Sequence, residues 1–465
     1  MKLKNVTRLL LSAFVLMCIA PSCVKEGPMG LTGPAGADGK DGTDANETCK
    51  ICHSPTSVDL IAVQYEFSKH SYGEAAFEET GNTGCTPCHA QEAFKYMVKN
   101  NVPATFTLSA ATGKWVNNYI TIASAAYGEI GCSTCHSAIH ATYGSSDLPS
   151  LTTVAPVAMT MWGGKKTIDL KADGGKSNLC VKCHQPRPFT NALTGDVQDY
   201  VGIAANPTGI MYDGTAESPN TTDKIRPTYR MHTHYGTAGA VYAGMGGVEF
   251  AGPLRYTNSV HTTAASCIDC HMGAKGGKSD LVGRAGGHTF FAKGNLTTCS
   301  ATGCHASTIT PTSTTLWLGP RAEIKKLLDD LAKKLVVGGV DLLNRNGNTN
   351  EAVGGVNLWA GLTTNNYDGY LNIYDPVTNP LMQSYPAADK IIVNNASSFK
   401  FIGNPPSSWS AAQIAYNNTL PAFPALTNAQ FGALINFQLV LRDYSLGIHN
   451  TNYARALLTN SIAKL

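Results

Sequence analysis

The pattern of apolar and polar positions predicts regular helices mainly near the C-terminal end. Apolar residues recur at helical spacing in residues 322–337. Those that would share one face are Ile324, Leu327, Leu328, Leu331 and Leu335. Two further helices are predicted at 428–442 and 451–463, since a Thr or an Asn is available to cap each. Residues 311–465 are therefore expected to form a helical and loop region that packs on the preceding part of the chain.

Residues 105–123 show the pattern of a strand pair. Two runs rich in apolar and β-branched residues flank Ala-Thr-Gly-Lys, which predicts a β-hairpin. Elsewhere in residues 46–310 Gly and Pro are frequent, so loops are expected to dominate. The predicted fold class is mainly α, with extensive irregular structure, one small β-hairpin and a C-terminal helical region.

The N-terminus has the composition of an export signal. Basic residues precede a short apolar run that ends at Ala20, too short to span a bilayer. Residues 1–22 are predicted to be a lipoprotein-type signal peptide, with Cys23 as the lipidated first residue. In residues 23–45 Gly recurs at every third position from Gly27 to Gly42, a collagen-like period that indicates an extended spacer after the anchor. The protein is expected to be exported and lipid-anchored in the periplasm or on the outer-membrane or cell surface.

One short pattern, Cys-x-x-Cys-His, occurs five times in the chain, where roughly 0.01 copies would arise by chance. A sixth copy has four residues between its cysteines. The pattern is the attachment signature of c-type haem, in which two thiols bond the porphyrin and the His binds iron. The attaching residues are Cys49, Cys52, Cys85, Cys88, Cys132, Cys135, Cys180, Cys183, Cys267, Cys270, Cys299 and Cys304. The proximal ligands are His53, His89, His136, His184, His271 and His305.

The expected cofactor is thus six covalently bound haem c. These motifs use twelve of the fourteen cysteines, and the other two lie in the export signal. Zinc is the alternative, but it gives no reason for a His to follow each second Cys. Residues 46–310 offer about 43 residues per haem, too few for separate protein cores, so a multihaem cytochrome domain cored by its haems is expected.

The remaining histidines nearly match the six distal positions. They are His70, His140, His232, His234, His261, His288 and His449. Two histidines on one iron give a low-spin electron carrier. His140 follows His136 by four residues, so on a helix both would face one way and His140 would serve a neighbouring haem. His232 and His234 would share a face of an extended segment, so one is expected to be a ligand and the other a spare.

Two stretches resemble a known family. Gly447-Ile-His449-Asn, between two predicted helices, and Cys267-Ile-Asp-Cys-His271-Met272, followed by His288, resemble the pentahaem cytochrome c nitrite reductases and related multihaem cytochromes. This resemblance implies that His449 supplies a distal ligand. The catalytic haem of those reductases is attached through a motif ending in Lys, whereas all six motifs here end in His. In haem number the chain also resembles outer-surface cytochromes of metal-respiring bacteria, some of which form filaments.

Charge changes the expected partners. The formal net charge is +3, and loss of the three cations of the signal leaves zero. Haem propionates would then make the holoprotein acidic, and no basic stripe suggests nucleic acid.

The expected function is electron relay through closely packed bis-histidine haems in anaerobic or extracellular respiration, with redox proteins or a terminal acceptor as partners. The alternatives are a multihaem reductase of a small nitrogen or sulfur oxyanion, with Tyr229–His234 as its candidate patch, and a filament-forming cytochrome. Whether the protein is an enzyme stays open, and an electron-transfer role is favoured.

Overall fold

The computed structural model divides the chain into two compact units, residues 1–51 and residues 52–465. The described residues all belong to the second unit. They are 53, 58–71, 81–120, 128–142, 145–215, 223–273, 285–292, 295–301, 303–306, 308–310, 312–345, 352–353, 356–357, 367–376 and 399–465. The predicted signal peptide, the spacer, Cys23, Cys49 and Cys52 lie outside them. Among the described helices none has the length and apolar character needed to cross a bilayer.

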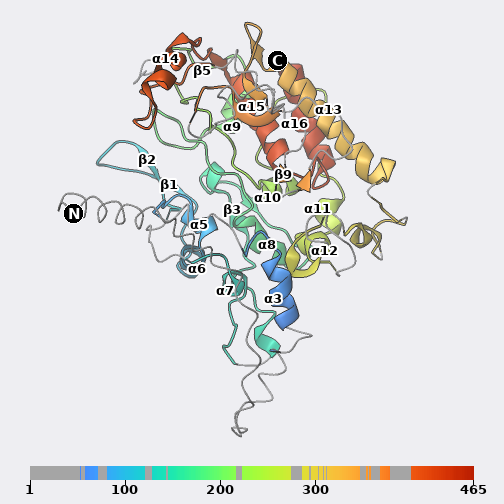
Figure 1. The fold of residues 1–465 in the computed structure, drawn as a ribbon. Coiled ribbons are helices and arrows are strands. Elements are labelled where there is room, and N and C mark those ends of the chain that lie inside the picture. The colour runs from blue at the N-terminus through green and yellow to red at the C-terminus, as the bar shows by residue number, and fades with distance from the viewer. Residues whose placement is uncertain are drawn as a thin grey trace, which may run out of the picture. The chain divides into compact units, whose positions relative to one another are not determined.

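The longest helices in the described residues, α13, α15 and α16, all lie after residue 300 (Figure 1). They are α3 (Val58–Glu66), α5 (Thr86–His89), α6 (Gln91–Lys99), α7 (Cys132–Cys135), α8 (Lys176–Val181), α9 (Tyr200–Ala205), α10 (Ala238–Tyr242), α11 (His261–Ala264), α12 (Cys267–His271), α13 (Gly319–Lys334), α14 (Ala411–Thr419), α15 (Asn428–Arg442) and α16 (Thr451–Lys464). Short 3-10 turns lie at Ser145–Asp147, Thr160–Trp162, Gly287–Thr289 and Leu296–Ser300, and a π turn at Thr314–Leu318 precedes α13.

Strands occur in antiparallel pairs only, within the described residues. The pairs are β1 (Phe106–Leu108) with β2 (Trp115–Asn117), β3 (Val157–Ala158) with β4 (Thr167–Ile168), β5 (Ile210–Tyr212) with β12 (Leu426–Thr427), β6 (Val336–Val337) with β7 (Val340–Asp341), β8 (Leu343–Arg345) with β11 (Tyr367–Leu371), and β9 (Ala352–Val353) with β10 (Val356–Asn357). The β1–β2 pair, in which Phe106 is opposite Asn117, confirms the predicted hairpin.

The C-terminal helices follow their predicted bounds closely. The Thr427 side chain accepts a hydrogen bond from the backbone of Gln430, and Asn450 does the same for Tyr453, so each helix begins at a polar cap. The predicted helix 322–337 differs at its end. It stops at Lys334, because the next residues form β6, which turns back through Gly338 and Gly339, both at positive φ.

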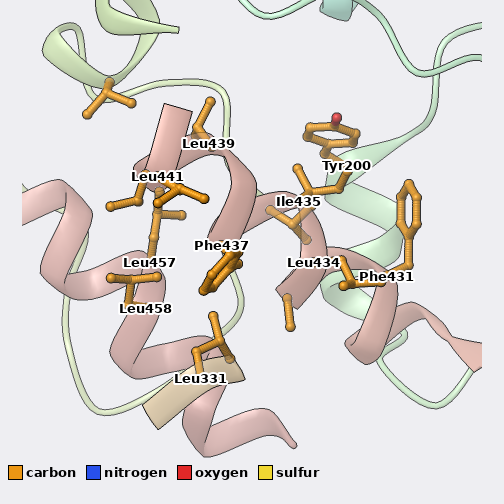
Figure 2. Packing of buried hydrophobic residues seen from close by; sticks show 14 of the residues in the cluster. Tyr200, Leu331, Phe431, Leu434, Ile435, Phe437, Leu439, Leu441, Leu457 and Leu458 are labelled. Carbon is orange, nitrogen blue, oxygen red and sulfur yellow. The ribbon is translucent and has the colours of Figure 1, made fainter. Parts of the chain in front are cut away.

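The main hydrophobic core surrounds α15, and Figure 2 shows part of it. Every residue of α15 except Gln430 is buried. This helix packs against α16 and α13 and also against α9 and α10, which lie between the fourth and fifth motifs. Buried residues from Val157 to Phe250 belong to the same core. The expectation of a region cored by haem alone therefore does not describe residues 157–250, which share a protein core with the C-terminal helices.

Candidate haem-binding sites

The histidines of the six motifs each lie beside one other histidine. We number the sites 1 to 6 in chain order. The pairs are His53–His140 (5.9 Å between ring centroids), His89–His234 (5.8 Å), His136–His288 (6.3 Å), His184–His70 (6.1 Å), His271–His449 (6.1 Å) and His305–His261 (5.9 Å). Each pair joins one motif histidine to one of the candidate distal histidines.

These separations fit two imidazoles on one iron. A metal-bound imidazole nitrogen lies about 2.0 Å from the metal and about 1.1 Å from its ring centroid, so two opposed rings would have centroids about 6.2 Å apart. All six observed separations lie within a few tenths of an ångström of that value. In site 2 the two Nε2 atoms also approach one another, at 3.5 Å. At each site the two histidines are therefore spaced as two ligands of a single metal ion would be.

In several of these histidines a backbone group hydrogen-bonds the ring, which leaves Nε2 available to bind a metal. Nδ1 of His271 is 2.8 Å from the carbonyl oxygen of Phe290, and Nδ1 of His261 is 3.0 Å from that of Ile448. The backbone of Gly236 hydrogen-bonds His184. A hydrogen bond at Nδ1 fixes the tautomer whose Nε2 lone pair can bind a metal.

Burial favours the neutral form of three of the paired histidines. It lowers the pKa of His70 and of His184 to about 4, and that of His234 to about 3, with neighbouring cations and histidines adding to the effect. His449 differs, because burial lowers its pKa but the carboxylate of Asp443 outweighs burial and leaves the pKa raised.

At two sites both motif cysteines sit on one helical turn. Sites 3 and 5 begin α7 and α12 at their first cysteine, and Ser266 caps α12 by accepting a hydrogen bond from the backbone of Asp269. Residues three apart share a face of a helix. The two thiols of a Cys-x-x-Cys turn can therefore reach the same side of one porphyrin.

Site 4 adjoins three other sites. The thiols of Cys183 and Cys88 are hydrogen-bonded to each other, which joins sites 4 and 2. Those of Cys180 and Cys267 are likewise bonded, which joins sites 4 and 5. Cys135 of site 3 is close enough to raise the pKa of both site 4 thiols. The two cysteines of site 6, Cys299 and Cys304, are in turn close enough to raise the pKa of Cys270 of site 5. Sites 2 to 6, whose cysteines the structure describes, thus form one connected array that branches at site 4.

Phe290 links three of these sites. Its ring is 4.7 Å from that of His70 in site 4 and 5.8 Å from that of His288 in site 3, and its carbonyl oxygen bonds His271 in site 5. Its φ is +57°, which is unusual for a bulky residue and marks a position that the surroundings enforce.

His232 is the histidine that pairs with no motif histidine. It is buried, and its Nδ1 accepts a hydrogen bond from the backbone of His234 at 3.0 Å. Its ring lies 5.2 Å from Tyr235 and from Tyr370, and Arg442 covers both tyrosine rings. Burial and then the charges of Arg442 and other arginines lower its pKa. The geometry thus makes His234 the paired histidine and His232 the spare.

His140 pairs with His53 of site 1 and not with His136, although the predicted reason was wrong. No helical turn carries the two residues, because α7 ends before His136 and His140 has a φ of +65° in a turn. The left-handed turn, and not helical spacing, directs His140 away from site 3.

Helix α3 offers a separate test of whether haem fits. Most of its residues are apolar, yet none is buried, and Leu60 and Val63 are 40% and 44% exposed. An apolar helix with no polypeptide over it needs another apolar partner. Its neighbour is the turn that carries His288, so a porphyrin at this site would supply one.

Sequence reasoning missed the residues that bond the paired histidines. Asp443, Phe290, Gly236 and Ile448 belong to no motif, and their positions depend on chain segments brought together by folding. The only available signal was an acidic residue in the turn before His449.

Within the described residues no group of three or more His, Cys, Asp or Glu side chains forms a metal site. No protein-family model matches the chain, and no similar protein was found among curated proteins or solved structures.

Proposed function

We propose that this chain is a hexahaem c-type cytochrome that relays electrons through closely spaced bis-histidine haems. The observation that carries the proposal is the pairing of six motif histidines with six other histidines at 5.8–6.3 Å. Export, lipid anchoring through Cys23 and redox partners outside the cytoplasm are part of the same proposal, and rest on the N-terminal sequence.

The residues have separable tasks. Two thiols would attach each porphyrin, and the paired imidazoles would both bind its iron, which favours the low-spin state. Bound haem would supply an iron that changes oxidation state by one electron. Backbone carbonyls and Asp443 orient the imidazoles, and the short distances between cysteines of different sites would bring neighbouring haems close together.

The test is a haem count and spin-state measurement on the purified full chain. We expect six haems per chain and EPR signals of low-spin ferric iron only. His234→Ala should convert about one haem in six to high spin, because it removes the ligand opposite His89. His232→Ala is the matched control, since it removes a buried histidine two residues away and should leave all six haems low spin. A colourless protein, or zinc bound by the thiols, would refute the proposal.

A second candidate function, reduction of a small oxyanion, rests on one observation. The spare His232 lies among Tyr235, Tyr370 and Arg442, next to a paired histidine of site 2. These groups donate hydrogen bonds or carry positive charge, as binding of an oxyanion would require. Turnover of nitrite, hydroxylamine or tetrathionate with a reduced dye, lost in His232→Ala, would favour it over electron relay. The filament hypothesis requires a distal ligand from a second copy, whereas each motif histidine here has a partner in its own chain.

A further inference from the structure

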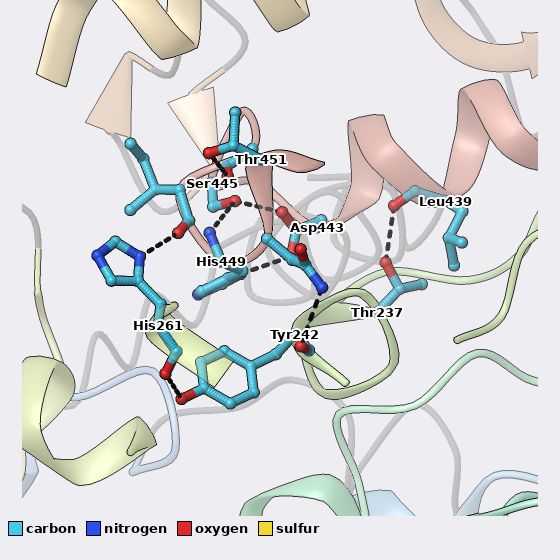
Figure 3. A network of polar contacts seen from close by, with 11 residues as sticks. Thr237, Tyr242, His261, Leu439, Asp443, Ser445, His449 and Thr451 are labelled. Atoms are coloured by element: carbon cyan, nitrogen blue, oxygen red, sulfur yellow. Dashed lines mark hydrogen bonds and ion pairs between the residues drawn. The ribbon is translucent and has the colours of Figure 1, made fainter. Parts of the chain in front are cut away.

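Site 5 differs from its neighbours in what its distal histidine bonds. Nδ1 of His449 is 2.5 Å from a carboxylate oxygen of Asp443. The partners found for His261, His271 and His184 are backbone groups, which carry no net charge. Figure 3 shows the network around His449 and, next to it, the carbonyl partner of His261.

Asp443 is held in place for this contact. Its side chain is fully buried at the C-terminal end of α15. The Ser445 hydroxyl donates to its second oxygen and also accepts the backbone N–H of His449, at 3.1 Å. The turn between them is strained, since Tyr444 and Leu446 both have positive φ. This turn therefore keeps a charged acceptor and the ring of His449 in a single arrangement.

A carboxylate at Nδ1 changes what the imidazole does at Nε2. It draws the Nδ1 proton toward itself and gives the ring partial imidazolate character, which makes the ring a stronger electron donor to a metal. A stronger donor stabilises the ferric form relative to the ferrous form. A backbone carbonyl has a weaker effect, because it is uncharged.

We infer that Asp443 is a positioning residue that lowers the reduction potential of the haem at site 5. The inference rests on the proposed function, because it concerns a haem held by His271 and His449. It assigns to the buried carboxylate a role beyond holding the turn. Because site 5 adjoins site 4 through Cys267 and site 6 through Cys270, the carboxylate would set the energy of a centre in the middle of the array.

The test is a spectroelectrochemical titration of the holoprotein, resolved into six one-electron components. Asp443→Asn keeps the shape and an acceptor at Nδ1 but removes the charge. We expect one component to move to higher potential, with its ferrous-to-ferric ratio at fixed potential rising about tenfold, or about 59 mV. The other five should stay in place.

A matched control separates the hydrogen bond from charge at a distance. Asp173 is a carboxylate near Cys180 and Cys267 that bonds Ser177 and no paired histidine. Asp173→Asn should change each ratio less than about twofold. An equal shift in both variants would overturn the inference in favour of simple charge removal.

A second variant covers the case in which Asp443→Asn does not accumulate. Ser445→Ala removes a donor from the carboxylate, which should then draw the Nδ1 proton more strongly and move the same component to lower potential. An upward shift of this component, or no shift, would overturn the inference.

If the wild-type protein carries six haems and the variants change no potential, this inference alone fails. If the wild-type protein carries no haem, the proposed function fails first.

Discussion

Helices α15 and α3 show two ways in which this chain treats apolar residues. In α15 all residues but one are buried against other polypeptide segments, whereas α3 has no buried residue although most of its residues are apolar. The short helices α11 and α12 also lack buried residues, and both carry a paired histidine. The chain thus has a region that forms its own core and a region whose apolar residues and histidine pairs the proposed haems would cover.

The largest expected effect comes from withholding haem. In full-length chain made without haem attachment, we expect the amides of α3, α11 and α12 to lose protection from hydrogen exchange about 100-fold, or ~2.7 kcal/mol. Those of α15 and α16 should lose far less, because their contacts are with polypeptide. Exchange read by mass spectrometry compares the two regions directly. Equal loss everywhere would show that the C-terminal core also depends on haem.

Next in size is a cavity in the protein core. Phe437 is 2% exposed and lies near Leu331 and Leu458 (Figure 2). Phe437→Ala should lower the free energy of unfolding by about 3–5 kcal/mol, by lost burial and an unfilled cavity. Val201→Ala on α9, at 64% exposure, should cost less than about 0.5 kcal/mol. Denaturant unfolding followed by circular dichroism measures both, and similar costs would contradict the assignment of the core.

A smaller effect tests the apolar surface of α3. Leu60→Ala should cost about 1 kcal/mol of local stability in the holoprotein, because a porphyrin would cover the side chain, and almost nothing in haem-free chain. Hydrogen exchange of the α3 amides gives the comparison. Leu108→Ala on β1, also an exposed leucine, should behave alike with and without haem. If Leu60→Ala lowered the local stability of α3 equally with and without haem, the side chain would be covered by polypeptide.

The smallest expected effect concerns an ion pair between α13 and α16. Arg455 bonds both oxygens of Glu323 and holds its pKa below the ordinary 4.5. A lowered folded-state pKa adds stability above the ordinary value, and this is lost as pH falls through the lowered value. Glu323→Gln should cost about 0.2–1 kcal/mol at pH 7, and the difference should shrink below pH 4.5. If Glu323→Gln lowered the free energy of unfolding equally below pH 4.5, the loss would come from packing and not from the ion pair.

The sequence predicted features that depend on local spacing. The hairpin and helices α15 and α16 follow from periodicity and caps that lie within a few residues of one another. The pairing of His89 with His234, or of His271 with His449, joins segments more than a hundred residues apart, so no local pattern specifies it. His140 shows the same limit, because the expected helical turn is replaced by a left-handed one. An acidic residue shortly before His449 was the only sign of Asp443 in the sequence, since its role comes from a turn that places it against His449.

Because the paired histidines lie far apart in the sequence, the sites of an exported chain would be completed in a set order. A chain crossing a membrane from its N-terminus presents His53 and His140 together early, and His70 and His184 soon after. The partner of His271 is His449, so under the proposed export, site 5 would stay incomplete until His449 has emerged. A chain that stopped at Ser445 would keep five histidine pairs and leave the sixth half-made.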